Sequence, residues 1–170
     1  QSYWVKKTMR SQRSPVEASQ HPLLGRRLHS AVLDAKERVF EVQLDARDLE
    51  LLAHHRVFDR VVLPAAGHVE MALAAGAAVF VSECVAVEDM VIHQALVLPE
   101  GEGLFVQLVL KEEADGGQSF QIFSIAAADK AGRWTLHTSG VLRAVGSEVE
   151  HVDIEPIRAA CKEAFSVDEY

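Results

Sequence analysis

The sequence is poor in cysteine and has no long apolar run. Its two cysteines among 170 residues, Cys84 and Cys161, cannot build a disulfide scaffold, and a reducing compartment fits them best. The longest uninterrupted apolar run, Met71–Val81, is much shorter than the about 20 residues that a membrane-spanning helix needs. Residues 1–15 also lack the apolar core of a secretory signal. These absences predict a cytoplasmic protein with no membrane span.

Basic charge is also scarce. The chain has 17 Lys and Arg against 25 Asp and Glu, and the resulting net charge of −8 argues against a nucleic-acid partner, because phosphates would be repelled. A local basic stretch is interpreted as a solvated tail; it contains Lys6, Lys7, Arg10 and Arg13. The proportions of apolar residues, 49%, and charged residues, 25%, are those of an ordinary folded protein of about one domain.

Polar segments flank the apolar part of the chain. Residues 1–20 show no apolar period and are predicted to be a linker or an extended arm leading into the domain. Tyr3 and Trp4 are unusual in a free tail, since they prefer a surface to lie on, and they suggest a neighbouring domain. Residues 146–170 turn polar again, with a short helix predicted over Glu155–Ala164.

The central part predicts one long helix among strands. Residues 26–45 favour a β-hairpin, residues 46–52 a short helical turn, and His54–Pro64 a single extended run. A helix is predicted from Pro64 to about Ser82, and it is so apolar on nearly all sides that it should be buried. Four further β-like stretches are separated by turn-forming residues: Val85–Leu98, Leu104–Lys111, Ser119–Ala127 and Trp134–Arg143.

This order of elements predicts an α+β protein. A single antiparallel sheet wrapped around one long central helix accommodates it with short connections. That arrangement is the hotdog fold.

His55 is the first candidate for chemistry. It lies just before the buried helix, at the end of a probable loop, and an imidazole can accept a proton near neutral pH. The start of the helix would offer backbone N–H groups to a developing oxyanion. A lone histidine is, however, more often structural than catalytic. Four further histidines are predicted to be structural or surface residues: His29, His93, His137 and His151.

Metal and thiol chemistry are weaker alternatives. A metal site would have to be built from four residues: His54, His55, His68 and Glu70. Neighbouring histidines on an extended chain point to opposite faces, and helix positions two apart face different sides, so we expect no metal. Cys84 is predicted to be a small core residue, and no nucleophile-elbow motif accompanies it or Cys161.

Five motifs in a fixed order carry a family resemblance. They are Gln1-Ser2-Tyr3-Trp4, His21-Pro22-Leu23-Leu24-Gly25, the stretch His55–Pro64 with its histidine and proline, Val69–Ala75, and Trp134-Thr135-Leu136-His137-Thr138-Ser139-Gly140. With these motifs the chain resembles the dehydratase domain of modular type I polyketide synthases over nearly all of its length. The resemblance implies that residues 1–20 are a post-acyltransferase linker and that residues 21–145 are the N-terminal hotdog of a double hotdog. Residues 146–170 would then begin the linker to a second hotdog, which this chain is expected to lack.

The resemblance also implies a reaction. Such domains eliminate water from a β-hydroxyacyl thioester on an acyl carrier protein to give an enoyl thioester. His55 would be the general base, and an aspartate of the second hotdog half would protonate the leaving hydroxyl. The substrate would be bound by Asp59 and by the run Val62, Leu63, Pro64 and Ala65. No cofactor is implied in this domain, since the substrate arrives on a phosphopantetheine arm. The implied partners are the carrier protein, the second half, neighbouring synthase domains and a second copy in a dimer.

Three positions depart from the family pattern. Asp59 stands where the family has glycine, His54 where it usually has aspartate, and Ala65 where it usually has glycine. A tyrosine is common where His68 stands. A variant or silent domain therefore stays open as an alternative: a double-bond isomerase, a pyran-type cyclase, or a non-catalytic structural or dimerisation module.

Overall fold

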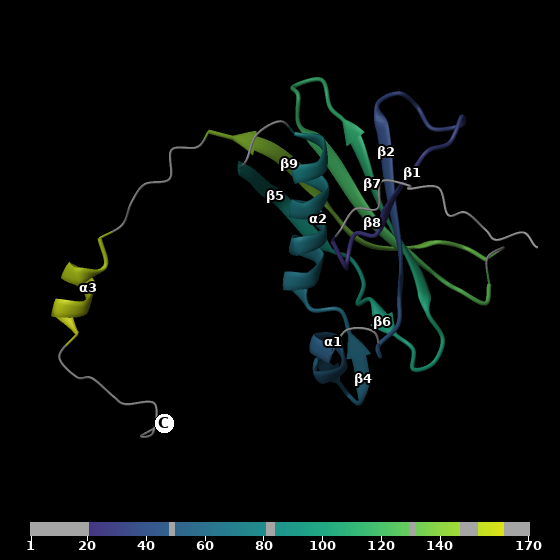
Figure 1. Ribbon diagram of the computed structural model, residues 1–170, viewed down its shortest axis with the longest axis horizontal. Coiled ribbons are helices and arrows are strands. Elements are labelled where there is room, and N and C mark those ends of the chain that lie inside the picture. Colours follow the sequence, from purple (N-terminus) through teal and green to yellow (C-terminus); the bar gives the residue numbers. More distant parts are fainter. Residues whose placement is uncertain (1–20, 48–49, 81–83, 130–131, 147–152, 162–170) are drawn as a thin grey trace, which may run out of the picture.

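A computed structural model describes residues 21–47, 50–80, 84–129, 132–146 and 153–161 (Figure 1). The predicted arm over residues 1–20 and the last residues of the predicted C-terminal helix lie outside the described residues. The main sheet has six strands in the order β1-β2-β7-β8-β9-β5, and all its pairings are antiparallel. These strands are β1 (Arg26–Leu28), β2 (Glu37–Leu44), β5 (Cys84–Ile92), β7 (Leu104–Glu112), β8 (Gln118–Ala126) and β9 (Thr135–Val145).

One long helix, α2 (Ala65–Val79), lies across one face of this sheet (Figure 1) and contacts β5, β7, β8 and β9. The predicted α+β hotdog arrangement is thereby confirmed. Close approach is possible because a Cβ on Gly76 would lie 2.7 Å from Cγ1 of Val85. The core between helix and sheet contains Met71, Phe120, Ile122 and Leu142, each no more than 1% exposed.

The prediction that α2 should be buried holds for only one of its faces. Its buried residues follow one stripe of helical period: Gly67, His68, Met71, Ala72, Ala75 and Gly76. The opposite face, including Glu70 and Ala77, is exposed. Alanines on that face count as apolar residues in the sequence pattern. Their side chains are small, however, so leaving them exposed to water costs little free energy.

A second, small sheet stands at the N-terminal end of α2. It consists of β3 (Arg56–Val57), β4 (Arg60–Val62) and β6 (Val97–Leu98), in the order β3-β4-β6. The short helix α1 (Glu50–His54) precedes it, close to the predicted helical turn. Within the described segments, no helix has the length and apolar character needed to cross a membrane.

Three predicted elements differ in detail. The hairpin over residues 26–45 forms, but its first strand ends at Leu28, and the 91% exposed Val32 lies in the connection. The run Val85–Leu98 is two strands, β5 and β6, that belong to different sheets. The C-terminal helix α3 (Glu155–Ala160) is shorter than predicted and buries no residue.

Candidate active site

His55 lies between α1 and the small sheet. Its N–H still donates to the carbonyl of Leu52, at 3.1 Å, and its own carbonyl accepts from the N–H of Val62, also at 3.1 Å. The Nδ1 atom lies 2.8 Å from the carbonyl oxygen of Val62. Because a carbonyl oxygen only accepts, Nδ1 must carry the hydrogen, and Nε2 keeps its lone pair. The side chain is exposed, so Nε2 can accept a proton from a bound molecule.

The segment after His55 is a tight hairpin, which corrects the prediction of one extended run. Strands β3 and β4 pair as Arg56↔Val61 and Val57↔Arg60, so Phe58 and Asp59 form the turn. Both have positive φ, 48° and 63°, as both central residues of a type I′ turn do. The backbone folds back here without the glycine or asparagine that usually signals such a turn.

Arg56 ties this hairpin to its surroundings. Its guanidinium donates to the carbonyl of Asp59 at 2.9 Å and to the carbonyl of Ala53 at 3.2 Å, and it pairs with the Glu100 carboxylate at 2.8 Å. Asp59 adopts a left-handed backbone conformation, which aspartate tolerates better than most residues. Its departure from the family glycine is compatible with the hairpin.

Substituting Phe58 by asparagine is expected to stabilise the fold. A left-handed φ costs an ordinary side chain about 1 kcal/mol, asparagine adopts it more easily, and the 96% exposed Phe58 ring loses no burial. Urea denaturation should show a free energy of unfolding about 1 kcal/mol higher. A decrease would mean that Phe58 makes a stabilising contact in the folded protein.

The predicted substrate-binding run joins β4 to α2. Val62 ends β4, and its carbonyl is the partner of His55. The Leu63 side chain is buried in the core at 3% exposure, and its N–H donates to the carbonyl of Leu96 at 2.9 Å. Pro64 is the N-cap of α2 and provides no side-chain cap. Its carbonyl accepts from the N–H of Gly67 at 2.8 Å, whereas the N–H groups of exposed Ala65 and Ala66 lie in the first turn, where a helix offers no acceptor of its own.

The four residues considered for a metal are not brought together. His68 is 1% exposed, and its Nδ1 lies 2.8 Å from the Thr138 hydroxyl, while His54 is an exposed residue at the end of α1. Glu70 instead pairs with Nε2 of His21 at 3.0 Å, which holds the turn of the motif His21–Gly25 against α2. Over the described ranges, no group of three His, Cys, Asp or Glu could hold a metal ion.

Burial keeps two core histidines neutral. It lowers the pKa of His68 to about 4, and the nearby His137 adds to this effect. His137 is 3% exposed, and its pKa is also lowered, mainly by burial. The sequence predicted His137 only as a structural or surface residue. Its position in the family motif Trp134–Gly140 was the one feature that could have indicated a further role.

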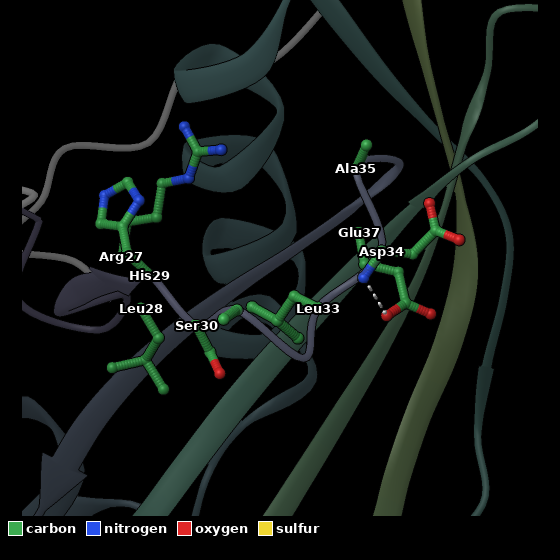
Figure 2. Close-up of a pocket in the computed structure, with 9 residues that line it drawn as sticks. Arg27, Leu28, His29, Ser30, Leu33, Asp34, Ala35 and Glu37 are labelled. Atoms are coloured by element: carbon green, nitrogen blue, oxygen red, sulfur yellow. Dashed lines mark hydrogen bonds between the residues drawn. The ribbon is translucent and has the colours of Figure 1, made fainter.

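A cavity of about 430 Å³ lies away from these residues, in the connection between β1 and β2 (Figure 2). It is lined on one side by Arg27 and His29 and on the other by Asp34 and Glu37. None of the predicted site residues contributes to it. The candidate active site is therefore His55 together with the N-terminal end of α2, and this cavity is not part of it.

Comparisons with known proteins identify the family of this chain. A sequence profile of the polyketide synthase dehydratase domain matches residues 21–125. Polyketide synthase GfsE of Streptomyces halstedii is 35% identical over 129 residues, which are 75% of this chain and 3% of that protein. The chain belongs to the polyketide synthase dehydratase domain family.

Solved structures show the same fold. The dehydratase domain from the CurF module of curacin polyketide synthase is 32% identical, with a TM-score of 0.75, over 89% of this chain and 54% of that one. The CurK dehydratase is 30% identical, also with a TM-score of 0.75, over 88% and 53%. The chain thus spans about half the length of the solved dehydratase domains and a few per cent of the synthase.

Proposed function

We propose that the chain is the N-terminal half of a dehydratase that removes water from a β-hydroxyacyl thioester carried on an acyl carrier protein. The observation that carries the proposal is the bond between Nδ1 of His55 and the Val62 carbonyl, since it leaves Nε2 as a base. Family membership supports the reaction class. The solved CurK dehydratases include inactive mutants in which a histidine is replaced by phenylalanine or an aspartate by asparagine.

In this reaction Nε2 of His55 takes the proton from C2 of the acyl group. The electron pair of the C2–H bond forms the C2–C3 double bond as the C3–O bond breaks, and the hydroxyl leaves as water with a proton from an acid. The Val62 carbonyl stabilises the imidazolium that forms, because Nδ1–H donates to it. The aspartate that acts as acid would come from a second hotdog half.

The start of α2 would polarise the thioester carbonyl. The N–H groups at its start, near Pro64 and Ala65, and the positive end of the helix dipole would favour negative charge on the thioester oxygen. Val62, Leu63 and Asp59 complete the proposed substrate site. Elimination involves no net redox change, so the only prosthetic group it calls for is the phosphopantetheine that carries the substrate.

The second half of the domain is the proposed partner of the β5 edge. Strand β5 ends the main sheet, and apolar residues on β5 and the neighbouring β9 are 41–50% exposed: Val91, Ile92 and Val145. Covering such a surface is favourable. We propose residues 21–145 as the first hotdog and residues 1–20 and 146–170 as linkers, with neighbouring synthase domains and a second copy as further partners.

The proposal is tested by incubating the full-length protein with a 3-hydroxyacyl thioester on its carrier protein and measuring the mass of the acyl product by mass spectrometry. Loss of one water, giving a 2-enoyl thioester, supports dehydration. An unchanged 3-hydroxyacyl group contradicts it and favours a structural module. A shifted double bond or a closed ring would identify the isomerase or cyclase alternative.

A further inference from the structure

Strand β9 contains an irregularity that places two neighbouring side chains in the core. Leu136 pairs with Phe123 and Thr138 with Ile122, so His137 is an extra residue with no partner across β8. Side chains in a regular strand alternate between faces. At this bulge, however, His137 and Thr138 are both buried, at 3% and 0% exposure.

Every polar atom of the His137 side chain has a partner. Its Nδ1 lies 3.1 Å from the carbonyl oxygen of Gln94, which can only accept, so Nδ1 carries the hydrogen. Its Nε2 then accepts from the hydroxyl of Ser124 at 2.8 Å, a residue that is 7% exposed. The backbone carbonyl of His137 also accepts from the N–H groups of His93, at 2.8 Å, and of Gln94, at 3.4 Å.

The segment that His137 holds leads directly to the candidate active site. Gln94 precedes Leu96, whose carbonyl accepts from the N–H of Leu63 at 2.9 Å. The next residue, Val97, pairs with Val62 in the small sheet. The Val62 carbonyl in turn binds Nδ1 of His55. Hydrogen bonds, joined by short stretches of backbone, therefore connect the buried histidine to the proposed base.

We propose that His137, oriented by Ser124, is a positioning residue for His55. It fixes Gln94, hence β6 and β4, so that the Val62 carbonyl stays where it binds Nδ1 of His55. This inference rests on the proposed role of His55 as base. Gln94 and Ala95 are exposed, so at these two residues the bond from Nδ1 of His137 adds a side-chain constraint to the backbone bonds of His93 and Gln94, before the chain enters the core at Leu96. Apolar side chains at these two positions would fill the core equally well. A buried pair such as His137 and Ser124, with all its hydrogen bonds made, instead favours a single side-chain arrangement.

Two substitutions separate the bonds of His137. In His137→Asn the amide nitrogen can replace Nδ1 and keep the bond to Gln94, whereas in His137→Gln it takes the place of Nε2 and that bond is lost. We expect kcat for dehydration to fall about 10–100-fold in the Gln variant with KM nearly unchanged, and the Asn variant to recover most of it. Ser124→Ala, which removes only the orienting hydroxyl, should give a smaller loss.

Thr138→Val is the matched control. It removes a neighbouring buried hydrogen bond, to His68, that does not lead to Gln94. Its kcat should stay near the wild-type value even if its stability falls. A purely structural role for His137 would give the Thr138 and His137 variants similar kinetics.

Hydrogen exchange read by mass spectrometry supplies a readout besides activity. In the full-length protein, peptides covering residues 61–63 should exchange faster in His137→Gln and at the wild-type rate in His137→Asn. Equal kcat values in the Asn and Gln variants, or unchanged exchange over residues 61–63, would overturn the inference. Full activity in His55→Phe would refute the proposed function instead, while the exchange data would still show whether His137 holds residues 61–63 in place.

Discussion

Replacing His55 by phenylalanine is expected to lower the rate of dehydration by about 10²–10⁴-fold, the usual contribution of a general base. The phenyl ring has no atom that could accept the C2 proton. The side chain is exposed and its ring bonds only to the Val62 carbonyl among the described residues, so the fold should persist. The measurement is enoyl product formed from a 3-hydroxyacyl carrier-protein substrate.

The matched control for this prediction is His54→Phe. His54 differs in position by one residue, is also exposed, and ends α1 rather than facing β4. Its substitution should leave the rate near the wild-type value, even though the family usually has aspartate there. Equal losses in both variants would mean that a bulky ring near α1, rather than loss of a base, lowers the rate.

Acid is expected to destabilise the fold through His68. An ordinary histidine has a pKa of about 6.5 and would be protonated in the unfolded chain below that pH, while burial holds the pKa of folded His68 at about 4. The unfolded state thus binds more protons between pH 6.5 and 4, so stability falls as pH falls through this window. The loss approaches roughly 3 kcal/mol near pH 4, and full stability is present above pH 6.5.

Urea denaturation at several pH values, comparing wild type with His68→Gln, measures this effect. Carboxylates and His137 contribute to acid sensitivity in both proteins, so the difference between the two curves isolates His68. That difference should change by roughly 3 kcal/mol between pH 7 and pH 4. Parallel curves would show that His68 is protonated as easily in the folded state as in the unfolded one.

The helix and the strands of the main sheet were predictable because their signals are local. Pro64 marks the start of α2, and alternating residues mark β2 and β7. The hairpin after His55 was not predictable, since Phe58 and Asp59 adopt positive φ without glycine, held by Arg56. Here a tertiary contact, rather than turn composition, selects the backbone conformation.

The candidate site was predictable only in part for a similar reason. His55 and Pro64 stand at a recognisable spacing. The hydrogen bond between His137 and Gln94, by contrast, depends on a bulge in β9 and joins residues 43 positions apart in the sequence. Nothing local in the sequence marks where an extra residue enters a ladder. A similar irregularity lies within β5, between Glu88 and Val91, where Asp89 has a φ of 49°. The run Val85–Leu98 divides only after Ile92, where β5 ends before the chain enters the small sheet at Val97.

The most direct test of the central claim isolates the proton transfer from the rest of the reaction. An acyl thioester that lacks the 3-hydroxyl group cannot lose water, but its C2 hydrogen can still be removed and returned. With this analogue on the carrier protein in D₂O, the full-length protein is predicted to exchange the C2 hydrogen for deuterium, and His55→Phe is predicted not to. Exchange at the wild-type rate in His55→Phe would contradict the assignment of His55 as the base.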